Sequence, residues 1–172
     1  RVTDDFRIKA CLPTIKYLLK EGASIALISH LGRPIEGKFE RKFSLRPVAD
    51  VLSTLLQTKV GFETNWINGI DWDETRITLC ENVRFLDGES SNNSDLSKKI
   101  AALCDVYVND AFATAHRAHA STVGAVSLIE QSCAGPLLIA EIEALDRITK
   151  KTQKPIVAVV GGSKVSTKID LL

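Results

Sequence analysis

The sequence predicts an α/β fold: a Rossmann-like, three-layer parallel sheet with helices on both faces. Short apolar runs of strand length, at 24–29, 77–80, 106–108 and 156–160, alternate with segments whose apolar residues recur at helical spacing. This alternation is typical of parallel strands joined by crossover helices. Because 45% of the 172 residues are hydrophobic and 25% are charged, the chain can bury the core that such a fold needs.

The first helix is predicted between Asp4 and Gly22. Its apolar residues recur every three or four positions, and glycine is common just after a helix. Pro13 lies inside this pattern and predicts a kink. The next predicted elements are a strand at 24–29, a helix at about 45–57 capped by Ser44, a weak strand at 60–62, a loop or single turn at 65–75 and a strand at 77–80.

The second half of the chain repeats the alternation. A helix at about 95–103 leads to the strand at 106–108, and a short helical turn begins at Ser121. A longer helix is predicted from Leu137 to about Lys150, with Pro136 at its entrance. The stretch 150–155 is the most linker-like, and the strand at 156–160 follows it.

Composition excludes several classes of protein. The 22 basic and 21 acidic residues leave a net charge of +1, which gives no overall attraction to nucleic acid or to a membrane surface. No apolar run approaches the roughly 18 residues that span a bilayer, and no signal peptide is visible. A cytoplasmic protein is therefore expected, with four reduced cysteines that form neither disulfides nor a zinc site: Cys11, Cys80, Cys104 and Cys133.

Cationic side chains follow four of the predicted strands. Because the carboxyl ends of parallel strands lie along one edge of a sheet, Arg33, Arg84 and Arg117 are expected to converge there. Guanidinium groups bind phosphate or carboxylate oxygens bidentately, so the sequence predicts a site for a small, multiply charged acid. The alternative is a set of solvated loops whose arginines pair with local acids, but no acid lies within 30–34 or 111–122. His30, His116 and His119, the chain's three histidines, all lie in these two loops.

The loop after the last strand resembles a phosphate cradle. Gly161 and Gly162 precede a predicted helix start, where free backbone N–H groups favour anions. The spacing is not that of a Walker P-loop, because Lys164 follows Gly162 by two residues. Lys164 and Lys168 would share one helix face and could both point toward a transferred phosphate, although a solvated lysine face is the alternative.

Together the four loops resemble, in order, the signatures of the phosphoglycerate kinase family: Ser29–Pro34, Glu81–Phe85, Asn109–Phe112 with Thr114–His119, and Gly161–Lys168. The resemblance implies a two-lobed enzyme that transfers a phosphoryl group reversibly between 1,3-bisphosphoglycerate and ADP, giving 3-phosphoglycerate and ATP. One lobe binds the phosphoglycerate, the other binds Mg-ADP or Mg-ATP, and the lobes close about a hinge. Residues 1–150 would be the N-terminal lobe without its first strand, with the connecting helix at about 137–150, and 151–172 would begin the nucleotide lobe.

The family resemblance also implies a role for each matching residue. Arg33, Arg84 and Arg117 would grip the phosphate that is not transferred, beside His30 and His116, and Leu31 and Gly32 belong to the same site. Arg7, which only the resemblance indicates, would face the reacting carboxyl group, and Lys164 would follow the transferred phosphoryl group. Lys168, with Gly161 and Gly162, would contact the nucleotide phosphates.

The resemblance has one local departure, Ala113 where the family has glycine. The resemblance assigns the contacts with adenosine and magnesium to residues beyond Leu172. No metal ligand is therefore predicted in this chain, and turnover by the chain alone is not expected. A monomer with small-molecule partners is expected. The alternatives are a binding module that senses a phosphorylated acid without catalysis, or a degenerate homologue that serves in protein interactions. Arg7, Lys164 and Lys168 argue against both, because a sensor has no use for groups aimed at a transferred phosphate.

Overall fold

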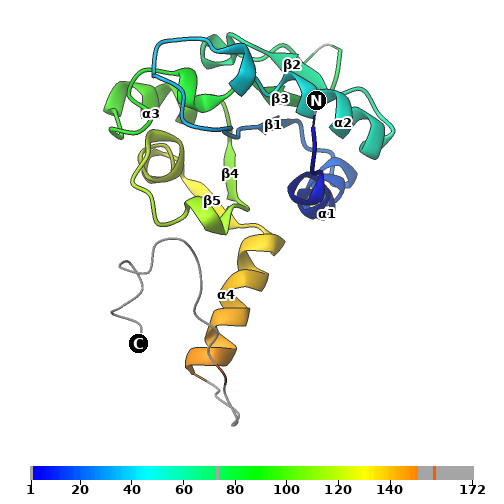
Figure 1. Ribbon diagram of the computed structural model, residues 1–172, viewed down its shortest axis with the longest axis vertical. Helices are drawn as coiled ribbons and strands as arrows, with labels where there is room; N and C mark the ends of the chain where they lie inside the picture. The colour runs from blue at the N-terminus through cyan, green and yellow to red at the C-terminus, as the bar shows by residue number, and fades with distance from the viewer. Residues whose placement is uncertain (1, 73, 151–156, 158–172) are drawn as a thin grey trace. The chain divides into compact units, whose positions relative to one another are not determined.

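The computed structural model describes residues 2–72, 74–150 and 157 (Figure 1). It confirms the predicted α/β class, with parallel strands and helices in alternation. The described helices and strands are, in chain order, α1 (Phe6–Lys20), β1 (Ile25–Leu27), α2 (Arg46–Leu56), β2 (Gly61–Glu63), β3 (Ile77–Cys80), α3 (Ser94–Ala101), β4 (Val106–Asn109), β5 (Gln131–Ala134) and α4 (Pro136–Thr149).

The five strands form two parallel sheets instead of the single sheet that was expected. The first sheet has the order β1-β3-β2, with Ile25 opposite Ile77 and Phe62 opposite Leu79. The second sheet pairs β4 with β5. The strand ends that carry Arg33 and Arg84 therefore belong to one sheet, and the strand end that leads to Arg117 belongs to another.

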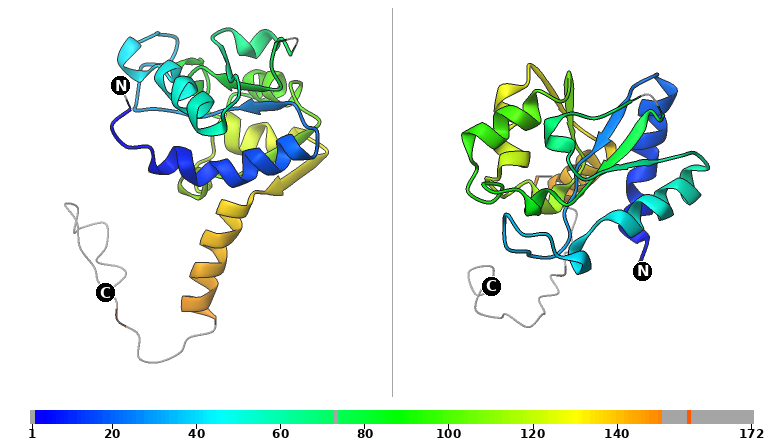
Figure 2. Two further views of the ribbon diagram at one scale, coloured as in Figure 1. Left: turned by 90° about the vertical axis from the view of Figure 1, so that its right-hand side faces the viewer. Right: turned by 90° about the horizontal axis from the view of Figure 1, so that it is seen from above.

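The first sheet lies between two helical layers (Figure 2). Successive side chains of a strand point to opposite faces, and on β3 Ile77 and Leu79 join a core cluster with α1 and α2, whereas Cys80 joins a cluster with α3. Ile15 and Leu52 fill the first cluster, and both are almost fully buried. This packing is the three-layer arrangement that the sequence predicts.

The first helix begins where the sequence predicts, after Asp4 and Asp5, whereas the start of the second helix differs from the prediction by one residue. The α1 helix begins at Phe6, whose backbone N–H donates to the Asp4 carboxylate (2.8 Å), and it continues through Pro13 to Lys20. The α2 helix begins at Arg46, so Ser44 lies one position too early to be its N-cap. The Ser44 hydroxyl still accepts the Arg46 N–H (3.2 Å), because a short polar side chain can reach the free N–H groups of a first turn.

Asp110, the residue after β4, holds the start of α4. Its Oδ1 accepts the backbone N–H groups of Leu137 (2.8 Å) and Leu138 (3.1 Å), and its Oδ2 accepts the Thr14 hydroxyl of α1 (2.5 Å). A Cβ atom at Gly135 would lie 2.4 Å from the Asp110 carboxyl group, so glycine leaves room for it. One carboxylate therefore joins α1, the end of β4 and the first turn of α4.

The chain divides into two compact units, residues 1–140 and 141–172, with the boundary inside α4. The first unit contains both sheets and both core clusters. It also contains every predicted site residue up to Arg117. Within the part of the chain that the structure describes, none of the helices is long and apolar enough to cross a membrane.

Candidate anion-binding site

The loop after β1 presents His30, Leu31, Gly32 and Arg33 at the carboxyl end of its strand. Gly32 has a φ of +65°, in the left-handed region that glycine adopts without strain. A Cβ atom there would lie 2.3 Å from the Phe43 ring, so a larger residue would displace that ring. This conformation exposes the Gly32 carbonyl to the next loop, where it accepts a hydrogen bond from Arg84 Nη1 (2.5 Å).

Arg84 follows β3 in a short 3-10 helix, Val83–Phe85, and its side chain is half-buried. Burial lowers the pKa of its guanidinium, as do the positive charges of Arg117 and Arg33, whereas the charge of Glu89 raises it. Arg84 is therefore close enough to both Arg117 and Arg33 to be repelled by them. The predicted convergence holds even though the strands belong to two sheets.

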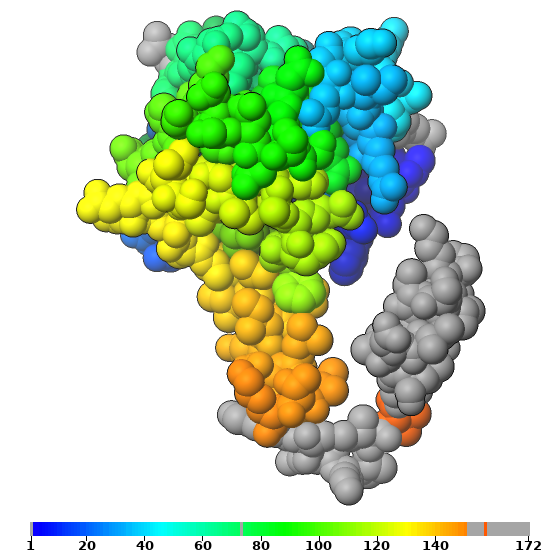
Figure 3. Space-filling model, turned by 90° about the vertical axis from the view of Figure 1, so that its left-hand side faces the viewer, coloured from blue at the N-terminus to red at the C-terminus, as the bar shows by residue number. Residues whose placement is uncertain are grey.

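His30 lies among the same cations. Its pKa is lowered from 6.5 to about 4, chiefly by burial and then, in decreasing order, by the charges of Arg84, Arg117, His119 and Arg7. Its imidazole is therefore neutral at pH 7. Figure 3 shows the segments around residues 30–40, 85–93 and 112–120 side by side on one face of the first unit.

Arg7 reaches this group from α1. It is the second residue of the helix, it is exposed, and its charge acts on His30. No local pattern in the sequence indicates this, because an exposed arginine in a first helical turn is unremarkable. The family resemblance alone identified the residue, and the structure brings it to the same group of cations.

The four arginines of this face are not neutralised by direct pairing. Within residues 2–72 and 74–150, none of Arg7, Arg33, Arg84 and Arg117 lies within 4.0 Å of a carboxylate oxygen. We call these four arginines, together with His30, the basic patch. Uncompensated guanidinium groups that repel one another are stabilised by a bound anion, so the patch is suited to a multiply charged acid.

The two remaining histidines have different surroundings. His119 lies with its Nδ1 3.5 Å from Oε1 of Glu89, which is only 2% exposed and also accepts the backbone N–H (3.0 Å) and hydroxyl (2.5 Å) of Ser121. His119 therefore helps to anchor its loop. His116 is exposed beside Arg117. Ala113, the departure from the family motif, is exposed in the 3-10 helix Phe112–Thr114.

Sequence reasoning missed the buried polar residues that hold these loops. Glu81 accepts the Ser44 hydroxyl (2.7 Å) and the Leu45 N–H (2.8 Å), and Asn82 donates to backbone carbonyls of two other loops. Glu36, which is only partly buried, also holds a loop: it accepts the backbone N–H groups of Gly88 and Ser90, both at 2.8 Å. The available signal was the pair Glu81 and Asn82, because charged and amide side chains directly after a fully buried strand need internal partners.

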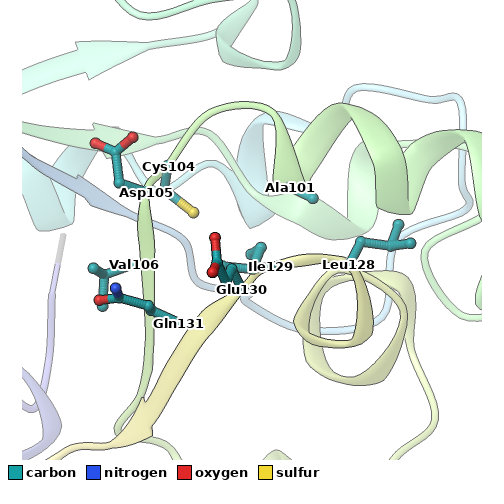
Figure 4. A pocket seen from close by; sticks show the side chains of 8 residues that line it. All are labelled: Ala101, Cys104, Asp105, Val106, Leu128, Ile129, Glu130 and Gln131. Atoms are coloured by element: carbon teal, nitrogen blue, oxygen red, sulfur yellow. The ribbon is translucent and has the colours of Figure 1, made fainter.

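A cavity of about 350 Å³ lies away from the basic patch (Figure 4). Its lining includes Val106 and Gln131, the first residues of β4 and β5. The cavity therefore lies at the amino ends of these two strands, whereas Arg117 follows the carboxyl end of β4. Its polar side chains include the carboxylates of Asp105 and Glu130. An acidic hollow does not attract a phosphorylated acid, so we assign the anion site to the patch and not to this cavity.

Lys164, Lys168, Gly161 and Gly162, the predicted nucleotide-side residues, lie outside the described residues. Within the described ranges, no group of three or more histidine, cysteine, aspartate or glutamate side chains is placed to hold a metal ion.

The low pKa of His30 has a testable consequence for stability. The unfolded chain takes up the imidazole proton near pH 6.5 and the folded chain only near pH 4, so the unfolded state binds more protons between these values. The free energy of unfolding is therefore expected to fall as the pH falls through this range. The change between about pH 7 and about pH 4.5, measured by urea unfolding, should be smaller in His30→Gln. An equal change in the two proteins would contradict the placement of His30 among the cations.

Comparison with known proteins supports a family assignment. The family model for phosphoglycerate kinase matches residues 1–172. Phosphoglycerate kinases from Coxiella burnetii and Francisella philomiragia are 55% and 52% identical to the chain over all of its 172 residues, which cover 44% of each relative. The chain thus spans less than half the length of these curated relatives.

Solved structures give the same assignment. The structure of phosphoglycerate kinase from Coxiella burnetii matches 99% of this chain and 44% of its own, with a TM-score of 0.90 and 54% identity. The crystal structure of the enzyme from Pyrococcus horikoshii matches 96% of this chain and 43% of its own, with a TM-score of 0.82 and 33% identity. With the basic patch at its strand ends and a family match over its whole length, this chain belongs to the phosphoglycerate kinase family.

Proposed function

We propose that this chain supplies the phosphoglycerate-binding part of an enzyme that transfers a phosphoryl group reversibly between 1,3-bisphosphoglycerate and ADP, giving 3-phosphoglycerate and ATP. The observation that carries the proposal is the convergence of Arg33, Arg84 and Arg117 from three loops, with no carboxylate partner among the described residues. Both substrates in the phosphoglycerate series carry a phosphate that does not react, and three guanidinium groups can hold its oxygens.

The patch would orient the substrate for reaction. The three arginines, with His30 and His116 beside them, would fix the non-reacting phosphate, and Arg7 would lie toward the carboxyl end. In the direction of ATP consumption, a carboxylate oxygen attacks the γ-phosphorus, a new P–O bond forms and the bond to ADP breaks. The protein needs no covalent nucleophile for this step. Alignment and positive charge around the transferred group are sufficient, and Arg7 and Lys164 are the residues proposed to provide that charge.

The nucleotide is assigned mainly to residues outside the described ones. Gly161, Gly162 and Lys168 would contact its phosphates, and Mg-ADP or Mg-ATP would be held by the portion of the enzyme that the relatives have and this chain does not cover. The described residues offer no set of metal ligands, so no step is assigned to a metal bound by them. We expect a cytoplasmic monomer that does not turn over without the nucleotide-binding portion.

Binding of 3-phosphoglycerate to the folded 172-residue chain tests this proposal. Weak binding is expected in isothermal titration calorimetry at low salt. It should weaken markedly when the ionic strength rises from about 0.01 M to about 0.1 M, which shortens the Debye length from about 30 Å to about 10 Å. Glycerate, which lacks the phosphate, is the matched control ligand and should bind less tightly. Folded protein that shows no heat of binding at low salt would overturn the assignment of the patch.

A further inference from the structure

Asn82, one of the buried residues that hold the loops of the basic patch, occupies the turn between β3 and Arg84. It is only 1% exposed, so every polar atom of its side chain needs a partner within the protein. Its Nδ2 donates to the carbonyls of Leu31 and Phe43, both at 2.9 Å, and its Oδ1 accepts the backbone N–H of Arg84 (3.1 Å). Both donors and the acceptor of the amide are thus used.

These hydrogen bonds connect Arg84 with the loop that contains Leu31 and Gly32. Asn82 fixes the Arg84 backbone through Oδ1, and it fixes Leu31 through Nδ2. Leu31 is followed by Gly32, whose carbonyl accepts the Arg84 guanidinium at Nη1 (2.5 Å). The Arg84 backbone is therefore held by Asn82 itself, and the Arg84 guanidinium is held by the residue next to one that Asn82 fixes. The bond between Asn82 and Leu31 joins residues 51 positions apart, so it also ties together two of the loops that form the basic patch.

Only a primary amide of this length satisfies the arrangement. Two carbonyl oxygens require two N–H donors, and the Arg84 N–H requires an acceptor on the same side chain. Aspartate keeps the acceptor but turns oxygens toward the carbonyls of Leu31 and Phe43, and alanine leaves all three groups unpaired. Unpaired buried polar groups are costly, so either change shifts the loops apart.

We propose that Asn82 is a positioning residue for phosphoryl transfer: it presets the guanidinium of Arg84 for the anionic substrate before the substrate binds. This inference rests on the proposed function, because it requires the basic patch to be the phosphoglycerate site. When the Arg84 side chain is already held, it loses little conformational entropy as the substrate binds. Preorganisation of this kind raises the affinity for the substrate. Asn82 does not itself touch the substrate.

The test is a double-mutant cycle on the 172-residue chain, with the dissociation constant of 3-phosphoglycerate measured by calorimetry. Asn82→Asp should raise this constant about tenfold in the wild-type background, because small misplacements of a binding group have large effects. Arg84→Lys removes the planar guanidinium that Asn82 presets. In that background the same substitution should change the constant less than about twofold, since the effect acts through Arg84.

Two controls separate positioning from loss of stability. Ser53→Ala removes partly buried hydrogen bonds to Val60 (3.1 Å) and Ala49 (3.0 Å) in and after α2, so it should lower the unfolding temperature and leave the dissociation constant unchanged. Asn82→Ser, which adds no charge, takes the place of Asn82→Asp if the latter does not fold. In folded Asn82→Ser the Nε–Hε signal of Arg84 in ¹⁵N-labelled protein should broaden relative to wild type.

The outcomes are distinct. An unchanged dissociation constant in folded Asn82 variants, or an equal change in the wild-type and Arg84→Lys backgrounds, overturns the role of Asn82 and leaves the proposed function standing. Failure of the wild-type chain to bind 3-phosphoglycerate overturns the proposed function, and with it the reaction that Asn82 would serve.

Discussion

Replacement of Arg117 by alanine is expected to weaken the binding of 3-phosphoglycerate between about tenfold and about a hundredfold. A hydrogen bond to a charged group contributes about 1.5–3 kcal/mol, and about 1.4 kcal/mol corresponds to a factor of ten. Arg117 acts electrostatically on both Arg84 and His30, which places its charge within the basic patch. Titration calorimetry on the folded variant at low salt measures the change.

Arg76→Ala is the matched control for this experiment. Arg76 directly precedes β3 and Arg84 follows it shortly, so the two arginines lie at opposite ends of the same strand. Arg117→Ala and Arg76→Ala each remove one positive charge from the first unit. Only Arg117→Ala, which lies in the basic patch, should weaken the binding of 3-phosphoglycerate. If Arg76→Ala weakens binding as much as Arg117→Ala does, the attraction comes from net charge and not from a site.

The Arg117 substitution also has an effect that needs no ligand. Because the charge of Arg117 lowers the pKa of His30, its removal should raise that pKa from about 4 toward 6.5. Titration of the His30 imidazole signals by NMR checks this. An unchanged pKa in the variant would show that Arg117 does not lie near His30, and would contradict the convergence of the loops after β1 and β4.

The sequence predicts the elements of this fold well where their signals are local. The strand at 77–80 and the helices around α1, α2, α3 and α4 were predicted within about two residues, because helical spacing and apolar runs lie within one segment. The strand β5 was not predicted. Its residues Gln131–Ala134 include no apolar run and all are exposed, so its extended form depends on pairing with β4, which the sequence of the segment does not encode.

In the candidate site, too, the features with local signals can be predicted from the sequence and the long-range contacts cannot. Arginine and histidine after a buried strand can be recognised in the sequence, so the predicted cations Arg33, Arg84 and Arg117 are the ones that converge. The bonds that hold their loops join distant residues: Asn82 to Leu31 across 51 positions, and Ser121 to Glu89 across 32. Spacing along the chain contains no signal for such contacts. The assignment of strands to two sheets escaped prediction for the same reason.

Arg7 has the strongest expected effect on catalysis, although no pattern in the sequence indicates it. It lies in the first turn of α1, where free N–H groups add positive potential, and its charge reaches His30. It is exposed and has no carboxylate partner among the described residues, so its guanidinium is available to a ligand. A charge placed where negative charge develops stabilises the transition state more than the ground state.

In the full-length enzyme that we propose contains this chain, Arg7→Ala should therefore lower kcat by about 100- to 1,000-fold and change KM for 3-phosphoglycerate much less. A coupled spectrophotometric assay with both substrates varied gives the two constants. Lys9→Ala is the matched control: Lys9 lies in the same helical turn, but its ammonium group is paired with Asp5 (2.9 Å), so its loss should leave kcat nearly unchanged. If Arg7→Ala raises KM and leaves kcat intact, then Arg7 contributes to substrate binding in the ground state, and transition-state stabilisation must be assigned to other residues.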